Sequence, residues 1–317
     1  MDDEMEKEIT AMTRTNRRPL WHRIRTNWVL YLFLLPTISY FIIFHYIPMV
    51  GVQIGFRDFR AIDGIWRSPW AGLKHFRRFF ASYNFFIVIK NTLALSFLQI
   101  VFNFPVPIIL ALLLNQLRQK KFKKFVQTVT YAPHFISTVV MVGILRTFCS
   151  PSSGIINHLI HLLGGNGIYF FALPGWFRPL YIISGIWQNA GWASIVYLAA
   201  LTGIDPTLHE AAMVDGASKL KRIVKIDIPG ILPVVVIMLI LESGRIMSIG
   251  FEKVFLMQTP LNLDMSEVIS TYVYKVGLLN VQYSYSTAIG FFNSVINLAL
   301  IVTVNAISKK ISESSLW

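Results

Sequence analysis

The chain has 317 residues, of which 54% are hydrophobic and 14% are charged, and its formal net charge is +13. This balance excludes an ordinary soluble globular protein, in which about a quarter of the residues are charged, and it predicts an integral membrane protein. The basic residues are distributed over several short segments rather than one basic domain, which argues against a nucleic-acid-binding protein.

Long uncharged stretches predict an all-α membrane protein with six transmembrane helices. A helix needs about 20 largely apolar residues to cross a bilayer. Residues 147–177 are also uncharged, but glycines and prolines interrupt them, so this segment is predicted to be a loop. The predicted spans lie near residues 28–48, 86–116, 126–148, 178–201, 231–256 and 286–307.

The distribution of Lys and Arg over the connecting segments predicts that both termini are cytoplasmic. Most basic residues lie on the side that contains the termini and the second and fourth connections, and cytoplasmic segments are enriched in Lys and Arg. Cys149 is the sole cysteine, so no internal disulfide and no metal cluster is expected. The predicted parts are a cytoplasmic tail over 1–27, a membrane domain over 28–307 and a cytoplasmic tail over 308–317.

The first outer loop contains six basic residues. They could contact an acidic solute, or they could dock the acidic surface of a partner protein, and the sequence leaves both interpretations open. They are Arg57, Arg60, Arg67, Lys74, Arg77 and Arg78.

Two short cytoplasmic helices are predicted in the connection 205–230 between the fourth and fifth spans. Asp205 followed by Pro206 is a favourable helix start, and Gly216 is a favourable helix end. The first helix is therefore predicted near 206–215. A second is predicted near 218–227, ending before Pro229.

The spacing of residues in this connection resembles the Glu-Ala-Ala coupling motif of ABC importer permeases. The stretches "LFLLPTISYFIIFHYIPM" and "IGFEKVFLMQTP" are also similar to the sugar-importing branch, particularly its oligosaccharide and polysaccharide subgroup. Ile228 stands where leucine is usual, which preserves the apolar bulk. The motif residues are Glu210, Ala211, Ala212, Gly216, Ile226, Ile228 and Pro229.

The resemblance implies a binding-protein-dependent sugar permease of the bacterial cell membrane that works by alternating access. Residues 206–215 would form a coupling helix seated on a separate ATPase subunit, which would bind ATP and magnesium. This chain has no Gly-x-x-x-x-Gly-Lys-Ser/Thr phosphate loop, so it is expected to be no enzyme, with no catalytic residue, metal or cofactor of its own. The implied partners are ATPase subunits, a second related permease in a heterodimer, an extracytoplasmic solute-binding protein and membrane lipid.

Polar and aromatic residues inside the predicted spans are candidates for the transport path, because polar groups are costly in lipid. Neutral amides beside tryptophans suit the binding of a saccharide. The structural alternative is that these amides form hydrogen bonds between neighbouring helices. Glu242 and Arg245 are three residues apart and could pair, or Arg245 could contact an acidic sugar. The candidates are Asn103, Trp187, Gln188, Asn189, Glu242, Arg245 and Asn293.

Other functions remain open from the sequence alone. An ABC permease for an amino acid, a peptide or phosphate would keep the coupling motif but need a different path. An ion-coupled secondary transporter would need ion ligands within the membrane, and Glu242 and Glu252 are the acidic candidates. A membrane scaffold without transport would give Gly216 no role in uptake.

Overall fold

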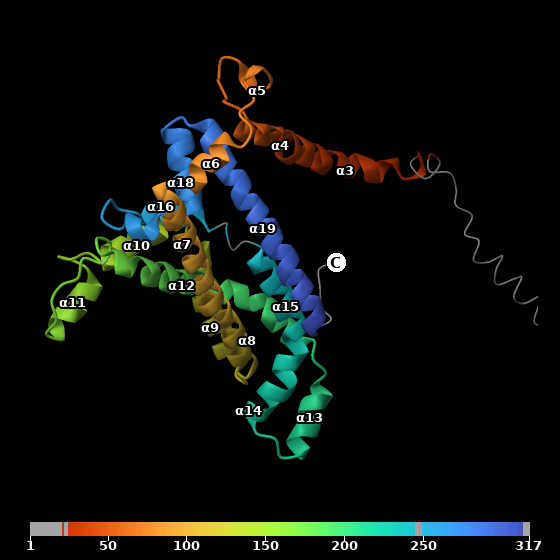
Figure 1. The fold of residues 1–317 in the computed structure, drawn as a ribbon. Helices are drawn as coiled ribbons and strands as arrows, with labels where there is room; N and C mark the ends of the chain where they lie inside the picture. The colour runs from red at the N-terminus through yellow and green to blue at the C-terminus, as the bar shows by residue number, and fades with distance from the viewer. Residues whose placement is uncertain (1–20, 22–24, 245–246, 248, 313–317) are drawn as a thin grey trace, which may run out of the picture. The chain divides into compact units, whose positions relative to one another are not determined.

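The computed structural model describes residue 21, residues 25–244, residue 247 and residues 249–312. These residues form helices and loops (Figure 1), and among them β-pairing is limited to an isolated bridge between Arg57 and Trp70. The predicted all-α class is confirmed for the part of the chain that the structure describes. The chain divides into two compact units, residues 1–53 and residues 54–317.

The first unit contains one long apolar helix. It consists of α3 (Trp28–Phe41), a π-helical turn η1 (Ile42–Tyr46) and α4 (Ile47–Met49), and it continues into the 3-10 turn η2 (Val50–Phe56). No side chain of α3 is buried. A helix that is apolar on every side is suited to lipid or to a partner helix.

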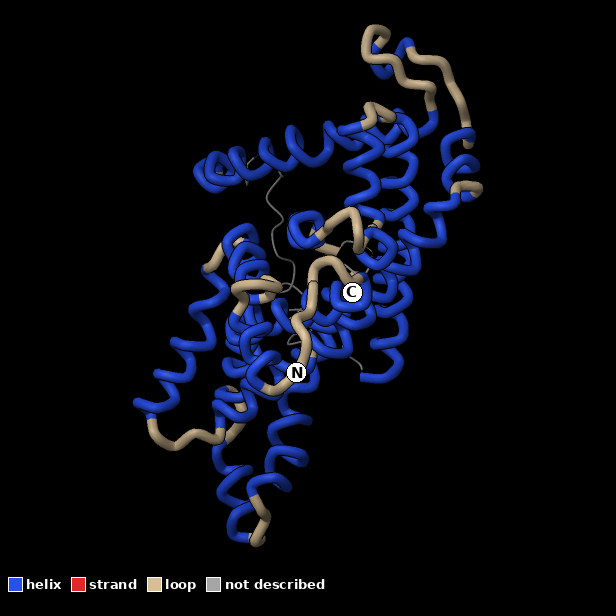
Figure 2. The backbone as a smooth tube through the Cα atoms, turned by 90° about the vertical axis from the view of Figure 1, so that its left-hand side faces the viewer, coloured by secondary structure: helices blue, strands red, loops and turns tan. Residues whose placement is uncertain are grey.

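The second unit contains the other helices that the structure describes. Figure 2 shows the described part of the chain as helices and connecting loops. The outer loop and the following membrane helix comprise α5 (Gly64–Arg67), α6 (Lys74–Phe80), α7 (Tyr83–Leu98), η3 (Gln99–Asn103) and α8 (Pro105–Asn115). The middle of the chain forms α9 (Lys120–Tyr131), η4 (Ala132–Phe135), α10 (Thr138–Phe148), α11 (Ile155–Leu162), α12 (Pro174–Thr202) and α13 (Pro206–Val214). The remainder forms α14 (Lys219–Arg222), η5 (Ile223–Asp227), α15 (Ile228–Ser243), α16 (Phe251–Met257), α17 (Leu263–Ser266), α18 (Ile269–Tyr274), η6 (Lys275–Leu279) and α19 (Tyr283–Ser312).

Helices α8 and α15 each continue past a proline that follows a π-helical turn. Proline lacks an N–H group, and its ring clashes with the carbonyl four residues earlier in a regular helix. A π-helical turn precedes each site: η3 lies before Pro105, and η5 lies before Pro229. The wider turn moves the affected carbonyl, so the helix continues. The prediction that the second cytoplasmic helix ends before Pro229 is therefore wrong, because residues 219–243 form one helix.

Four helices in the described part of the chain are long and apolar enough to cross a bilayer: Trp28–Phe56, Tyr83–Asn115, Lys219–Ser243 and Tyr283–Ile307. They correspond to the first, second, fifth and sixth predicted spans. A fifth candidate is the pair Lys120–Phe135 and Thr138–Phe148, which meet at 101°. The bend lies within the third predicted span.

Polar contacts support this bend at the position where the helical hydrogen bonds stop. Ile136 and Ser137 have extended backbone conformations, and the Ser137 side chain accepts a hydrogen bond from the Val140 N–H group. The carbonyl of Ile136, freed from the helix, accepts a hydrogen bond of 2.9 Å from Gln188 Nε2. Irregular backbone at membrane depth requires such internal partners.

Helix α12 covers the fourth predicted span with 29 residues, yet it is not among the helices apolar enough to cross a bilayer unaided. Several of its polar side chains are instead enclosed by protein. Ser184, Gln188 and Ser194 are buried. A span that is enclosed by protein can be less apolar than one that faces lipid.

The fifth predicted span, 231–256, is not one helix. Helix α15 ends at Ser243 with Gly244 as its C-cap, and α16 begins at Phe251 after the N-cap Gly250. Discontinuous helices often mark the substrate sites of membrane transporters.

The predicted loop 147–177 also differs from expectation, because it contains α11 and the start of α12.

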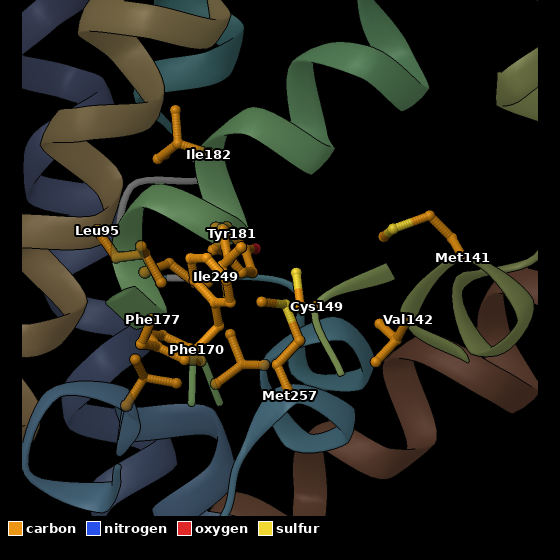
Figure 3. Packing of buried hydrophobic residues seen from close by; sticks show 13 residues of the cluster. Leu95, Met141, Val142, Cys149, Phe170, Phe177, Tyr181, Ile182, Ile249 and Met257 are labelled. Atoms are coloured by element: carbon orange, nitrogen blue, oxygen red, sulfur yellow. The ribbon is translucent and has the colours of Figure 1, made fainter. Parts of the chain in front are cut away.

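Three buried clusters hold the second unit together. Leu95, Phe177, Tyr181 and Met257 belong to a cluster formed by α7, α10, α12 and α16 (Figure 3). A second cluster joins α6, α7, α18 and α19 around Phe79. The third joins α8, α12 and α15. The first and third clusters pack α12 against both helices of the interrupted fifth span, α16 and α15.

Candidate functional site

The helix predicted near 206–215 is present as α13, which ends at Val214, and its two ends are capped as the sequence indicates. The Asp205 carboxylate accepts a hydrogen bond of 2.9 Å from the backbone N–H group of Thr207, and this bond holds the pKa of Asp205 below its ordinary value. At the other end Gly216 has a φ of 73°, in the left-handed region that favours glycine. The chain can therefore reverse sharply between α13 and α14.

Apolar side chains remain at the surface of this helix pair. Leu208, Met213 and Val214 on α13 are exposed, and so is Leu220 on α14. A cluster of exposed apolar side chains on a short, well-capped helix is typical of a protein interface. Of the motif residues, Glu210, Ala211, Gly216, Ile228 and Pro229 are exposed, and Ala212 and Ile226 are partly buried.

A buried carboxylate connects α13 to two other helices. Asp227, the last residue of η5, has no exposed surface. Its Oδ1 atom lies 3.2 Å from His209 Nε2 of α13, and its Oδ2 atom accepts a hydrogen bond of 3.2 Å from Gln116 Nε2 at the end of α8. One side chain thus contacts the predicted coupling helix, the second span and the fifth span.

A cavity of about 340 Å³ lies beside α12 at membrane depth. Three of the predicted path residues line it: Asn103 from η3, Asn189 from α12 and Glu242 from α15. Gln99 and Gly185 also contribute to its wall. The cavity therefore combines neutral amides with one carboxylate, and both kinds of group can bind hydroxyl groups.

An aromatic pair adjoins the cavity at Asn189. The Asn189 Oδ1 atom lies 3.1 Å from Nδ1 of His134, and the His134 ring stacks on Trp192 with 4.8 Å between centroids. Phe135 meets the edge of Trp192. These rings come from η4 and α12, so the bend in the third span brings them together.

The other predicted path residues lie elsewhere. Gln188 is buried and donates to Ile136, as described above, whereas Trp187 lines a separate apolar cavity of about 670 Å³ between α10, α11 and α12. Asn293 does not line the polar cavity, and its Oδ1 atom is buried without a partner in the described part of the chain. Arg245 lies outside the described residues.

The basic residues of the first outer loop divide into two groups. Arg57 donates to the carbonyls of Trp66 and Ser68, Lys74 pairs with Asp58 at 2.8 Å, and Arg78 lies over the ring of Tyr285. Arg57 and Lys74 thus stabilise the loop itself, whereas Arg78 joins α6 to α19. Arg60, Arg67 and Arg77 are exposed and remain available for an anionic partner.

Sequence reasoning missed Lys253, Gly185, His209, Gln116 and Asp227. Lys253 is a charged residue inside the predicted fifth span, and the cost of charge in lipid could have singled it out. The contacts of the other residues join segments far apart in the sequence. No local pattern could have revealed them.

Comparison with known proteins places the chain in a family. The model of the "Binding-protein-dependent transport system inner membrane component" family matches residues 103–313. The polygalacturonan/rhamnogalacturonan transport system permease protein YteP of Bacillus subtilis is 44% identical over 310 residues, covering 98% of this chain and 97% of the relative. Protein LplB of the same organism is 42% identical and covers 92% of both chains.

Solved structures agree with this assignment. A chain from a bacterial ABC transporter involved in the import of the acidic polysaccharide alginate is 44% identical, with a TM-score of 0.87 over 92% of this chain and 99% of that chain. A chain from the alginate transporter in complex with an alginate pentasaccharide-bound periplasmic protein has a TM-score of 0.88. The resemblance drawn from the coupling motif is confirmed. This chain belongs to the family of inner membrane components of binding-protein-dependent transport systems.

Proposed function

We propose that this inner membrane component imports oligosaccharides or polysaccharide fragments as part of an ATP-driven transporter. The observation that carries the proposal is its 44% identity, over 98% of its length, to a polygalacturonan/rhamnogalacturonan permease. The relatives that share the family include an arabinooligosaccharide permease as well. The polar cavity and the coupling helix supply the two parts that such a function requires.

Helix α13 is the proposed contact with an ATPase subunit that binds ATP and magnesium. Its exposed apolar side chains, Leu208, Met213 and Val214, would enter a cleft of that subunit. The continuous helix over residues 219–243 would then transmit the movement, because a helix without a break acts as a rigid lever. Glu210 would contact the ATPase or brace α13 against it.

The cavity beside Gly185 is the proposed position of the saccharide during transport. The hydroxyl groups of a sugar both donate and accept hydrogen bonds, so they suit the amides of Asn103 and Asn189 and the carboxylate of Glu242. The neighbouring Trp192 and His134 rings offer flat faces for the apolar side of a sugar ring. Alternating access would expose this cavity first to one side of the membrane and then to the other.

The proposed topology has six spans and cytoplasmic termini, with α12 enclosed by protein in the complete transporter. A second, related permease would complete the path, since several faces of this chain expose apolar side chains. A solute-binding protein would deliver the saccharide to the outer side. Arg60, Arg67 and Arg77 are the proposed contacts for its acidic surface.

Purification of the complete complex from its own host tests this proposal. The chain is isolated by a mild affinity method, its bound proteins are identified by mass spectrometry, and the complex is reconstituted in liposomes. We expect a phosphate-loop ATPase, a second permease and a solute-binding protein to copurify. ATP-dependent uptake of trigalacturonate or another oligosaccharide is expected, and it should require the binding protein.

Two results would contradict the proposal. Uptake that follows an ion gradient and continues without ATP would support a secondary transporter. Uptake of an amino acid, a peptide or phosphate by the same complex, with no oligosaccharide transported, would support another solute. Variants of Gly216, discussed below, separate coupling from assembly.

A further inference from the structure

Lys253 is a partly buried cation that the proposed coupling and transport path do not use. It lies in α16, the short helix that follows the interruption of the fifth span. Its Nζ atom donates a hydrogen bond of 2.9 Å to the carbonyl of Tyr181 and lies 4.5 Å from the centroid of the Tyr181 ring. None of the ion pairs found between described residues involves Lys253.

This environment differs from that of Lys275, another partly buried lysine. Lys275 Nζ lies 2.6 Å from the Glu267 carboxylate, which neutralises its charge. Lys253 has only a carbonyl oxygen and an aromatic face as its described partners. An ammonium group offers three N–H donors, and a buried charge without a counterion is costly. Lys253 therefore has donors and charge that can serve a ligand.

Gly185 lines the polar cavity and lies next to this ammonium group, although Lys253 itself is not among the residues that line the cavity. A Cβ atom placed on Gly185 would lie 3.3 Å from Lys253 Nζ and 2.7 Å from Asn103 Nδ2. Both Gly185 and Asn103 line the cavity. The absence of a side chain at position 185 thus leaves the ammonium and the amide next to each other behind the cavity wall.

The Asn103 side chain has an unused acceptor at the same place. Its Oδ1 atom is buried and has no hydrogen-bond partner within the described part of the chain. A buried acceptor without a partner costs free energy, which a donor on a ligand would recover. A sugar hydroxyl group is such a donor.

We infer that Lys253, together with Asn103 at the Gly185 gap, binds the carboxylate-bearing unit of an acidic oligosaccharide as it passes through the cavity. Lys253 pairs with the uronate carboxylate, and Asn103 accepts a hydrogen bond from a neighbouring hydroxyl group. Glu242, on the other helix of the interrupted span, accepts hydrogen bonds from hydroxyl groups, and it is not paired with Lys253 in any of the ion pairs found between described residues. The inference rests on the proposed function and assigns the acid selectivity of the path to one side chain.

The experiment measures uptake by the complete transporter in liposomes with its solute-binding protein. The probes are trigalacturonate and its fully methyl-esterified form, which keeps the hydroxyl groups but has no charge. The variants are Lys253→Met, which keeps the length of the side chain, and Lys253→Arg, which keeps the charge. Lys120→Met, which removes an exposed positive charge at the start of α9, is the matched control.

We expect Lys253→Met to lower trigalacturonate uptake about tenfold or more relative to uptake of the ester, because it removes a hydrogen bond to a charged group. Lys253→Arg is expected to restore most of this ratio, and Lys120→Met to leave it unchanged. Direct titration of trigalacturonate into the detergent-solubilised complex, without the binding protein, should show the same loss of affinity. This second readout separates the cavity from the selectivity of the binding protein.

If Lys253→Met, with intact assembly, lowered the uptake of both saccharides equally, Lys253 would have only a structural role and the inference would be overturned. An unchanged ratio of acidic to neutral uptake would overturn it as well, while leaving the proposed function intact. The proposed function itself fails in a different way, when the wild-type complex transports neither saccharide. Gly185→Ala provides an independent check, since its methyl group fills the gap and should also reduce trigalacturonate uptake.

Discussion

His209 in α13, the proposed coupling helix, lies directly against Asp227 at the end of the π-helical turn, with 3.2 Å between Nε2 and Oδ1. Because Asp227 also accepts a hydrogen bond from Gln116, the carboxylate holds α13 to two membrane helices at once. Movement of α13 is thereby connected to the second and fifth spans through one buried group. A rigid connection of this kind is what a lever between an ATPase and a transport path needs.

The first prediction concerns this connection. Asp227→Asn keeps the size of the side chain but removes its charge, so the contact with His209 weakens. We expect the amount of solute transported per ATP hydrolysed to fall on the order of 2- to 30-fold, the usual range for side chains that transmit coupling. Solute uptake and ATP hydrolysis are measured together in liposomes.

Lys225→Gln is the control for Asp227→Asn, because Lys225 is exposed in the same π-helical turn. It should leave the ratio of transport to hydrolysis unchanged. If Asp227→Asn also left that ratio unchanged, with normal assembly, the buried carboxylate would have no part in coupling.

The second prediction concerns the backbone of Gly216. Its φ of 73° is left-handed, but a Cβ atom there would contact nothing within 4 Å, so substitution acts through backbone strain alone. Left-handed conformation costs about 1–2 kcal/mol for most L-residues, and less for asparagine. We expect uptake to decrease in the order Gly, Asn, Ala, Val at position 216. Copurification of the partner subunits checks that assembly is retained, and equal uptake by all four would exclude a role in coupling.

The third prediction concerns the contact between α12 and α9. A Cβ atom on Gly191 would overlap the carbonyl oxygen of Thr130, which is backbone and cannot rotate away. Gly191→Ala should therefore separate the two helices and lower stability by about 1–3 kcal/mol. Thermal unfolding in detergent measures this loss.

Gly143→Ala is the matched control for Gly191→Ala. Gly143 lies inside α10, and a Cβ atom there would meet nothing within 4 Å. Because alanine is the better helix former, we expect this variant to be as stable as the wild type or more so, by up to about 1 kcal/mol. Similar destabilisation by both variants would show that the close contact between Gly191 and Thr130 is not the cause of the loss of stability.

The fourth prediction concerns pH and the outer loop. The hydrogen bond from Lys74 holds the pKa of Asp58 below its ordinary value. A carboxyl group whose pKa is lowered by folding stabilises the folded loop above its unfolded pKa of about 3.9, and this contribution is lost as pH falls through the lower folded value. We expect Asp58→Asn to destabilise the protein at neutral pH by at most about 1 kcal/mol, since the pair is partly exposed.

Thermal unfolding at several pH values checks this expectation. The difference between wild type and Asp58→Asn should be constant above about pH 5 and should shrink below about pH 4. Lys74→Met should remove most of the pH-dependent difference. A difference that stays constant at acidic pH would show that the Asp58 carboxylate has no such role.

The sequence predicts where a helix begins or ends when the residues at that position alone decide it. Asp205, Pro206 and Gly216 predict the ends of α13, because caps and left-handed turns depend on the residues at those positions. The helix end at Pro229 was predicted wrongly, because the π-helical turn η5 accommodates the proline. Whether a helix ends at a proline or continues past it depends on the backbone hydrogen bonds around that residue, and the presence of a proline alone does not determine them.

The site was predictable only in part. Asn103, Asn189 and Glu242 were selected as polar groups in apolar segments, and tertiary packing brings them to one cavity. Gln188, chosen by the same reasoning, instead supports the bend at Ile136. Burial cost identifies a polar residue as unusual, but it does not tell which neighbour or cavity the side chain faces.

By itself, the sequence determined the membrane class, the helical composition and the coupling motif, because hydrophobicity, caps and residue spacing are properties of short segments. Tertiary structure alone decided that Asp227 joins α13 to α8, that Gly191 admits the backbone of α9, and that Lys253 lies next to Gly185 in the cavity wall. Each of these contacts links residues from different helices. Such contacts depend on how the helices pack, and packing is set by the shapes of many side chains together rather than by any one segment.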